Sequence, residues 1–283
     1  MNEARNTDPF QRILVGVDAS AGSFSALEAA AGLAAELHSE LIGLFVEDDD
    51  LLSLAGLPFS QEVTMSGSVR SLDPTQIEQE MKRRATAARR ALRSVAEQRR
   101  LRWNFQVVRG RVTHELTAAA HSMDLLCVGP CARPATRRGG RGETARLVSQ
   151  ARGAVLYLER HAESRSKPVM ALLNGGAYDR DAVEICNRVA GARGSDVALV
   201  IQAKDESQAG EILDMARQRL GNVRNVTVRT IVPSDRQAIL RLVGAAETGL
   251  LVTAADADLA TEEGLNAVIE AADCPVLVLG SRE

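Results

Sequence analysis

The sequence has little of what marks several specialised classes of protein. Its 283 residues include only four cysteines and 3% aromatic residues, and 34 basic against 37 acidic residues give a formal charge of −3. So few cysteines in a chain of this length exclude a small disulfide scaffold. The missing basic excess disfavours nucleic acid as an obligate partner, because duplex binding needs a surplus of Lys and Arg.

Long apolar runs are missing as well. No stretch of 18 apolar residues occurs, and residues 1–9 lack the apolar segment of a secretory signal, so we expect a cytoplasmic protein without a membrane partner. Only Cys127 and Cys131 lie close together, and no Cys-x-x-Cys pair or neighbouring histidine completes a zinc site. We therefore expect no metal, and a buried, reduced thiol at Cys127.

The chain contains the same order of predicted strands and helices twice. Each half opens with a short apolar strand, at 12–18 and at 168–174, and a helix with an apolar face follows, at 23–37 and at 179–190. The further strands expected are 41–46, 104–108, 124–129 and 154–158 in the first half, and 197–201, 226–232, 249–254 and 275–279 in the second. Strands that alternate with helices at this spacing predict an α/β fold of two repeated doubly wound open parallel sheets. Each sheet is βαβαβαβαβ in order, with helices on both faces.

A polar stretch, residues 160–167, separates the two halves and indicates a linker. The sequence therefore predicts two domains, residues 1–160 and 168–283. Charges differ between them, with 22 basic and 20 acidic residues (+2) up to residue 166 and 12 and 17 (−5) after it. Because both closing strands are apolar, we expect the domains to pair within the chain and a homodimer to be a further form of association.

Two insertions distinguish the first half, and both begin where a strand ends. Residues 47–73 contain the apolar segment Leu51–Phe59, which either packs as a lid over the first domain or docks a protein partner. The second insertion, residues 130–141, carries four arginines that either contact phosphates or are solvated in a loop. In open α/β sheets, ligands collect at the carboxyl ends of the strands, which is where these insertions start.

The sequence resembles the universal stress protein family, in its tandem form with two domains in one chain. The resemblance covers nearly the whole chain and rests on the opening strand and turn Ile13–Ser20, on Gly110 after the third strand, and on the fourth strand Asp124–Gly129. Nucleotide-binding members carry a phosphate loop of Gly, two residues, Gly, nine residues, Gly, and then Ser or Thr.

The resemblance implies a nucleotide site, which we assign residue by residue. Its candidate members are Asp18, Val46, Gly129, Ala132, Gly142, Glu143 and Thr144. Asp18 holds the adenine and ribose end and Val46 packs the base, whereas the glycine loop wraps the phosphates. Gly129 and Gly142 stand at the first and third glycine positions of the loop. Ala132 replaces the middle glycine, and Glu143 replaces the Ser or Thr. Thr144 lies one place beyond that position. A carboxylate about 4 Å from a phosphate charge costs about 1 to 4 kcal/mol.

The second half departs further from the pattern. Asn174 replaces the opening Asp, no glycine loop follows Ala254, and an acidic run over 256–263 would repel phosphate. We expect this domain not to bind nucleotide. A helix in the first half carries nine basic residues spread around it, Lys82, Arg83, Arg84, Arg89, Arg90, Arg93, Arg99, Arg100 and Arg102. For these a solvated face is favoured over nucleic-acid binding.

No catalytic constellation emerges from the sequence. No P-loop and no Gly-x-Ser-x-Gly motif occur, and His114 and His121, seven residues apart on one helix, are expected at the surface. Three functions remain open. The chain is a stress-response regulatory protein that binds ATP or another adenine nucleotide weakly at most, a nucleotide switch with slow hydrolysis or autophosphorylation, or a protein-docking module. We favour the first and assign no catalytic residue.

Overall fold

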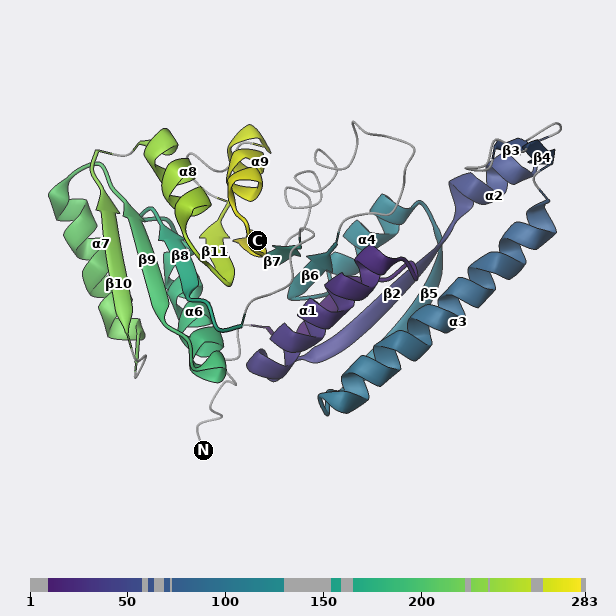
Figure 1. Ribbon diagram of the computed structural model, residues 1–283, viewed down its shortest axis with the longest axis horizontal. Helices are drawn as coiled ribbons and strands as arrows, with labels where there is room; N and C mark the ends of the chain where they lie inside the picture. The colour runs from purple at the N-terminus through teal and green to yellow at the C-terminus, as the bar shows by residue number, and fades with distance from the viewer. Residues whose placement is uncertain are drawn as a thin grey trace.

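The computed structural model describes residues 10–57, 61–63, 69–71, 73–129, 154–158, 165–221, 225–233, 235–255 and 262–280. In the first half, the main strands are β1 (Arg12–Gly16), β2 (Glu40–Asp48), β5 (Trp103–Gly110), β6 (Leu125–Val128) and β7 (Ala154–Tyr157). The second half has β8 (Val169–Leu173), β9 (Val197–Gln202), β10 (Val226–Ile231), β11 (Leu250–Ala254) and β12 (Val276–Leu279). All ten belong to one continuous sheet (Figure 1).

The sheet has the order β10-β9-β8-β11-β12-β7-β6-β1-β2-β5, so both halves follow the same strand order. Within each half, every neighbouring pair is parallel. The closing strands β7 and β12 then pair with each other, and they do so antiparallel, with Leu156 opposite Leu277. The predicted α/β class is confirmed, and the two expected sheets are joined into one.

Helices cover both faces of this sheet. On one face lie α1 (Ala21–Leu37), α3 (Pro74–Gln98), α6 (Asp179–Arg193) and α7 (Glu206–Arg219), whose buried side chains belong to one apolar cluster. On the other lie α4 (Val112–Ala120), α8 (Arg236–Ala245) and α9 (Glu262–Ala271), which pack into a second cluster. Several of these helices begin where a side chain accepts from a free N–H group; Ser20, Asp73 and Asp205 cap α1, α3 and α7, for example, whereas α4 and α6 have no such cap.

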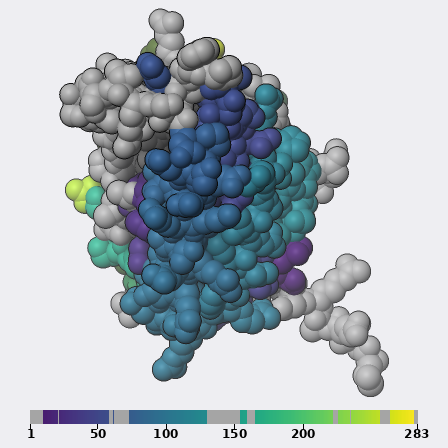
Figure 2. All heavy atoms as spheres, turned by 90° about the vertical axis from the view of Figure 1, so that its right-hand side faces the viewer, coloured from purple at the N-terminus to yellow at the C-terminus, as the bar shows by residue number. Residues whose placement is uncertain are grey.

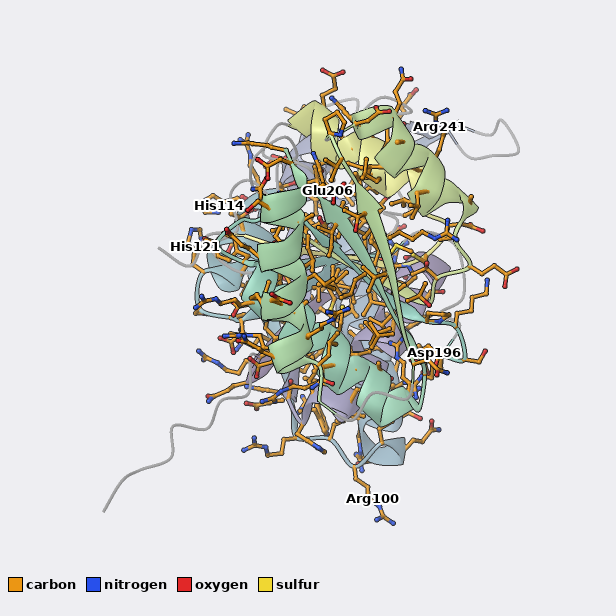
Figure 3. All side chains as sticks on the ribbon, turned by 90° about the vertical axis from the view of Figure 1, so that its left-hand side faces the viewer. Arg100, His114, His121, Asp196, Glu206 and Arg241 are labelled. Atoms are coloured by element: carbon orange, nitrogen blue, oxygen red, sulfur yellow. The ribbon has the colours of Figure 1, made fainter. Side chains whose placement is uncertain are left out.

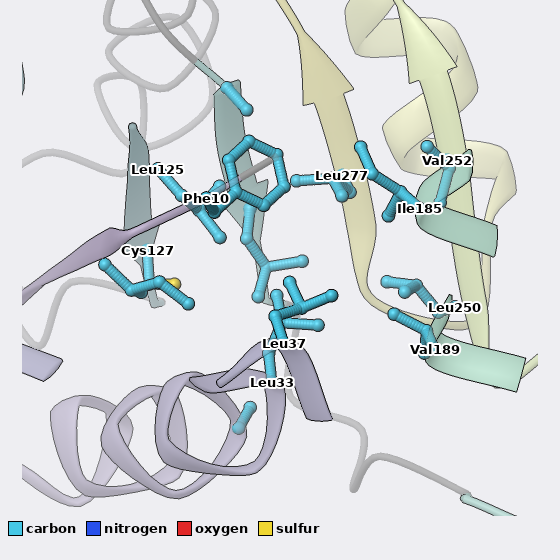
Figure 4. Close-up of a cluster of buried hydrophobic side chains, with 14 of the residues drawn as sticks. Phe10, Leu33, Leu37, Leu125, Cys127, Ile185, Val189, Leu250, Val252 and Leu277 are labelled. Carbon is cyan, nitrogen blue, oxygen red and sulfur yellow. The ribbon is translucent and has the colours of Figure 1, made fainter. Parts of the chain in front are cut away.

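The core runs through both halves without a break. Leu37 of α1, Ile185 and Val189 of α6, and Leu277 of β12 are each at most 1% exposed, and Figure 4 shows them in one cluster. Beside it, a buried ion pair also joins the halves, because Arg193 Nε of α6 lies 3.1 Å from Glu36 Oε1 of α1. The two halves are therefore packed against each other as well as paired through the sheet.

The first insertion contains structure that the sequence did not predict. It forms a short helix, α2 (Asp49–Ala55), and a two-stranded antiparallel sheet of β3 (Gln61–Val63) and β4 (Val69–Ser71), at the upper right of Figure 1. Asp48 caps α2 by accepting a hydrogen bond from Asp50 N at 3.1 Å. The second insertion lies outside the described residues.

Candidate functional site at the carboxyl end of the first-half sheet

Three of the predicted site residues follow neighbouring strands at the same edge of the sheet. Gly16 of β1 is opposite Leu44 of β2, so two residues further along each chain Asp18 is level with Val46. Val15 is opposite Cys127 of β6, which places Gly129 level with the residue before Asp18. The structure thus brings Asp18, Val46 and Gly129 together at the point where the strand order reverses. Ala132, Gly142, Glu143 and Thr144 lie outside the described residues.

Asp18 forms the turn that leads from β1 into α1. Its Oδ1 accepts a hydrogen bond from Ser20 N at 2.9 Å, and Ala19 between them has a φ of 61°. This is an Asx-turn, in which a short side chain replaces a backbone acceptor. Because the turn uses Oδ1 only, the exposed carboxylate keeps its second oxygen as an acceptor at the sheet edge.

The turn also leaves backbone donors available. Within the described chain, the N–H groups of Asp18 and Ala19 donate to no protein acceptor. Five residues after Asp18, the hydroxyl of Ser23 donates to Ser20 O at 3.0 Å and so does not turn back to these donors. One turn at the carboxyl end of the sheet therefore carries one carboxylate oxygen and two N–H groups that bond to no described protein group.

The equivalent turn of the second half has the same backbone. Gly176 N donates to Asn174 Oδ1 at 2.9 Å, and Gly175 between them has a φ of 81°. Asn174 thus forms the Asx-turn that Asp18 forms in the first half. Replacement of Asp by Asn has therefore not changed the shape of the turn.

The two turns differ in the group that accepts hydrogen bonds from their backbone N–H groups. The buried carboxylate of Asp179, in the first turn of α6, accepts from Gly175 N at 2.8 Å and from Asn174 N at 3.1 Å. Gln208 of α7 covers the turn from outside, since a Cβ on Gly175 would lie 2.8 Å from its Nε2. The second half therefore fills with its own side chains the position that the first half leaves open. No sequence motif marks Asp179 or Gln208 for this role.

Gly129 has a packing role of its own. A Cβ at this position would lie 2.7 Å from Ala26 Cβ and 3.0 Å from Gly22 O, both in α1. Glycine therefore lets the end of β6 approach the first turns of α1, which brings the strand end close to the Asp18 turn. Val46 is half-buried and packs against the second apolar cluster.

Ion pairs fix the base of the α2 insertion beside this edge. Arg109 at the end of β5 lies 3.1 Å from Glu47, and Arg111 lies 3.3 Å from Asp50 of α2. The described apolar side chains of the insertion differ in burial, since Ala55 is buried and Leu52 is half-buried. Leu54 and Leu57 are 54% and 57% exposed, whereas the lid interpretation would bury them. Phe59 lies outside the described residues.

The other chemistry-bearing side chains lie apart from this edge. His114 and His121 are exposed near the two ends of α4, as predicted, and His121 Nδ1 lies 2.7 Å from Thr117 O (Figure 3). Cys127 is buried, as predicted, and so are Cys186 and Cys274. Burial raises the pKa of the Cys186 thiol well above its usual range and that of Cys274 to about 11. Both thiols are therefore protonated and unreactive at neutral pH.

No group of His, Cys, Asp and Glu within the described ranges is arranged to hold a metal ion. Over the same part of the chain, no helix is both long and apolar enough to span a membrane.

The fold and this strand-end turn define an open, doubly wound α/β protein of the kind that binds ligands at its switch point. A model of the universal stress protein family matches residues 9–156. The chain belongs to the universal stress protein family. A comparison with curated proteins gives no match.

Solved structures resemble the chain over its whole length. A universal stress protein from Archaeoglobus fulgidus DSM 4304 has a TM-score of 0.71 at 14% identity, covering 98% of this chain and 100% of that one. The cytoplasmic domain of a prokaryotic cation chloride cotransporter has a TM-score of 0.59 at 13% identity, with 97% of each chain covered. A universal stress protein from Pseudomonas aeruginosa UCBPP-PA14 has a TM-score of 0.58 at 14% identity, with 96% and 94% covered. At these identities the likeness is one of fold.

Proposed function

We propose that the chain is a regulatory protein of the universal stress family whose first half binds an adenine nucleotide weakly, and whose second half does not. The supporting observation is the difference between two turns of the same shape. After β1, one oxygen of Asp18 and two backbone N–H groups remain for a ligand, whereas after β8 the equivalent donors bind Asp179. We also propose residues 1–160 and 168–283 as its two domains.

The chemistry of the open turn suits the sugar and base of a nucleotide. A carboxylate oxygen accepts hydrogen bonds from the two ribose hydroxyls, and backbone N–H groups donate to nitrogen or oxygen acceptors. Val46, level with Asp18, offers a half-buried apolar side chain against which a base can pack. The phosphate end is weaker, since Glu143 brings a carboxylate where the family has a hydroxyl. We therefore expect micromolar or weaker binding, to about the same extent for adenosine as for ATP.

The test uses the chain's own asparagine turn as a guide. Asp18→Asn is expected to keep the Asx-turn, because Asn174 makes it, but to replace the accepting oxygen by an amide donor. Loss of a charged hydrogen bond of about 1.5 to 3 kcal/mol should weaken binding of a fluorescent adenine nucleotide by about tenfold or more. Asn174→Asp is the matched control and should leave affinity unchanged.

Both variants must first show the far-ultraviolet circular dichroism and the Trp103 fluorescence of the parent chain. If Asp18→Asn bound as tightly as the parent, the site would lie elsewhere. If the parent bound no adenine compound at millimolar concentration, the nucleotide part of the proposal would be wrong and the non-binding regulatory alternative would stand.

A further inference from the structure

The two ends of the ten-stranded sheet are unpaired edges. Strand β5 ends the first half and β10 the second, and neither has an outer neighbour within the described chain. Both edges expose apolar side chains, Val107 at 48%, Val226 at 41% and Val228 at 37%. Unpaired edges of this kind are templates for association with another strand. Figures 2 and 3 show these opposite ends of the molecule.

The helix beside β5 is strongly basic. Between residues 81 and 96, α3 has six basic residues and no acidic one. Arg84 and Arg93 pair with acids of their own helix. Lys82, Arg83, Arg89 and Arg90 are exposed and take part in no ion pair within the described residues. In Figure 2, α3 and β5 make up much of the face toward the viewer.

The helix beside β10 is acidic in its first turns, whereas Arg217 and Arg219 stand in its last turn. Between residues 205 and 215, which span the cap and first turns of α7, there are four acidic residues and no basic one. Glu206, Glu211 and Asp214 are exposed and form no ion pair with any described residue. Figure 3 shows α7 on the outside of this end, with Glu206 at one end of the helix. Over their full lengths, α3 has six basic and three acidic residues and α7 has three acidic and two basic residues, so the two helices carry net charges of opposite sign.

The topology makes these ends complementary in direction as well as in charge. Because β7 and β12 pair antiparallel, all strands of one half run opposite to those of the other, and so β5 and β10 are antiparallel. The helices α3 and α7 pack on the same face of the sheet, since both contribute to the first apolar cluster. A second copy that continues the sheet beyond β5, turned by the accumulated twist of the strands, therefore brings its β10 antiparallel to β5 and its α7 to the face that carries α3.

We propose that the partner of the α3 face is the α7 face of a second copy of this chain, in a head-to-tail interface. The interface is heterologous, so each copy keeps one free end of each kind and further copies can add. A symmetric contact through two α3 helices would instead oppose like charges. Exposed Arg229 on β10 and Arg102 before β5 add like charge at the strand edges, so the helices must supply the attraction and association must weaken with salt.

Charge reversal tests this interface in the full-length chain. The α3-reversed variant carries Arg83→Glu and Arg90→Glu, and the α7-reversed variant carries Glu211→Lys and Asp214→Lys. By sedimentation velocity at about 0.1 M salt, each alone should associate at least about tenfold more weakly than the parent. An equimolar mixture of the two should associate again, because each variant then meets a face of opposite charge.

The matched control reverses two arginines of α8, on the other face of the sheet, with Arg236→Glu and Arg241→Glu. It should associate as the parent does, and about 1 M salt should dissociate the parent. The proposal is overturned if the parent stays monomeric at millimolar concentration, if the mixture fails to associate, or if the control loses association equally. Loss of association on nuclease treatment would also overturn it, in favour of a nucleic acid bound to α3.

Discussion

Replacing Glu36 by alanine is expected to destabilise the whole chain, because this residue neutralises a cation buried between the two halves. Glu36 of α1 and Arg193 of α6 have side chains only 6% and 1% exposed, and Arg193 Nε lies 3.1 Å from Glu36 Oε1. Arg165 approaches the same oxygen at 3.6 Å. The residues are 157 positions apart in sequence, so the pair forms only when the halves are packed together.

The magnitude follows from burial. Removing one partner of a buried pair leaves the other charge in an apolar environment, which costs about 3–5 kcal/mol. With a urea m-value of about 3 kcal/mol/M, the unfolding midpoint should fall by about 1 to 1.7 M. Glu36 Oε2 is also buried without a hydrogen-bond partner among the described residues, so the pair itself is costly to keep. Glu36→Leu combined with Arg193→Met should therefore recover most of the loss.

Urea unfolding followed by two signals measures this effect. Trp103, the only tryptophan, lies in β5 and reports the first half, whereas circular dichroism reports the whole chain. The matched control is Arg93→Ala, which breaks an ion pair with Glu97 that is shorter, at 2.8 Å, but more than half exposed. This control should cost only about 0.3–0.5 kcal/mol.

If Glu36→Ala costs no more than Arg93→Ala, Glu36 does not neutralise a buried cation. If Glu36→Ala shifts the circular dichroism transition but leaves that of Trp103 unchanged, the pair does not join the halves, since a pair that joins them must affect both. If Glu36→Leu with Arg193→Met recovers stability, the cost of Glu36→Ala comes mainly from the unbalanced buried charge and not from lost packing.

Three further predictions follow from individual positions. Gly129→Ala should lower the free energy of unfolding by about 1–3 kcal/mol, because the new methyl group meets Ala26 and Gly22 of α1. Its control, Gly191→Ala on α6, places a methyl group in open space and should raise the free energy of unfolding by about 0.5–1 kcal/mol. Both values are measured in the same urea experiment. In a Cys131→Ser background, the three remaining buried thiols should react with a thiol reagent at pH 8 only after unfolding; fast reaction of the native protein would contradict their burial. Glu143→Ser should strengthen ATP binding more than adenosine binding in calorimetric titrations, and an equal gain for both ligands would show that Glu143 does not face the phosphates.

The strands could be predicted from the sequence because parallel strands buried on both faces are continuous apolar runs. Residues 169–173 and 250–254 are buried at every position and are rich in Val, Leu and Met. The α2 helix and the β3–β4 sheet could not be predicted, because short elements on an insertion bury too few side chains to impose a period. The family resemblance supplied the candidate ligand residues, and pattern alone would not have singled out Val46.

Contacts between residues that are distant in sequence could not be predicted. Glu36 and Arg193 carry no local signal, because each is one of many charged residues on amphipathic helices. The replacement of Asp18 by Asn174 can be read from the sequence, but its structural effect cannot. In the structure Asn174 builds the same turn, and a carboxylate five residues later occupies the backbone donors of that turn.

The position of Asp179 explains why such an occupant is stable. It stands in the first turn of α6, where the helix dipole favours a negative charge, and two backbone N–H groups of the preceding turn complete its hydrogen bonding. A buried carboxylate is otherwise costly, so these donors and the dipole together permit its 2% exposure. In the first half, Ser23 lies the same number of residues after the turn but is the third residue of α1, and its hydroxyl donates to Ser20 O, not toward the turn. In the second half, one side chain in the first turn of α6 thus occupies the backbone donors of the preceding turn.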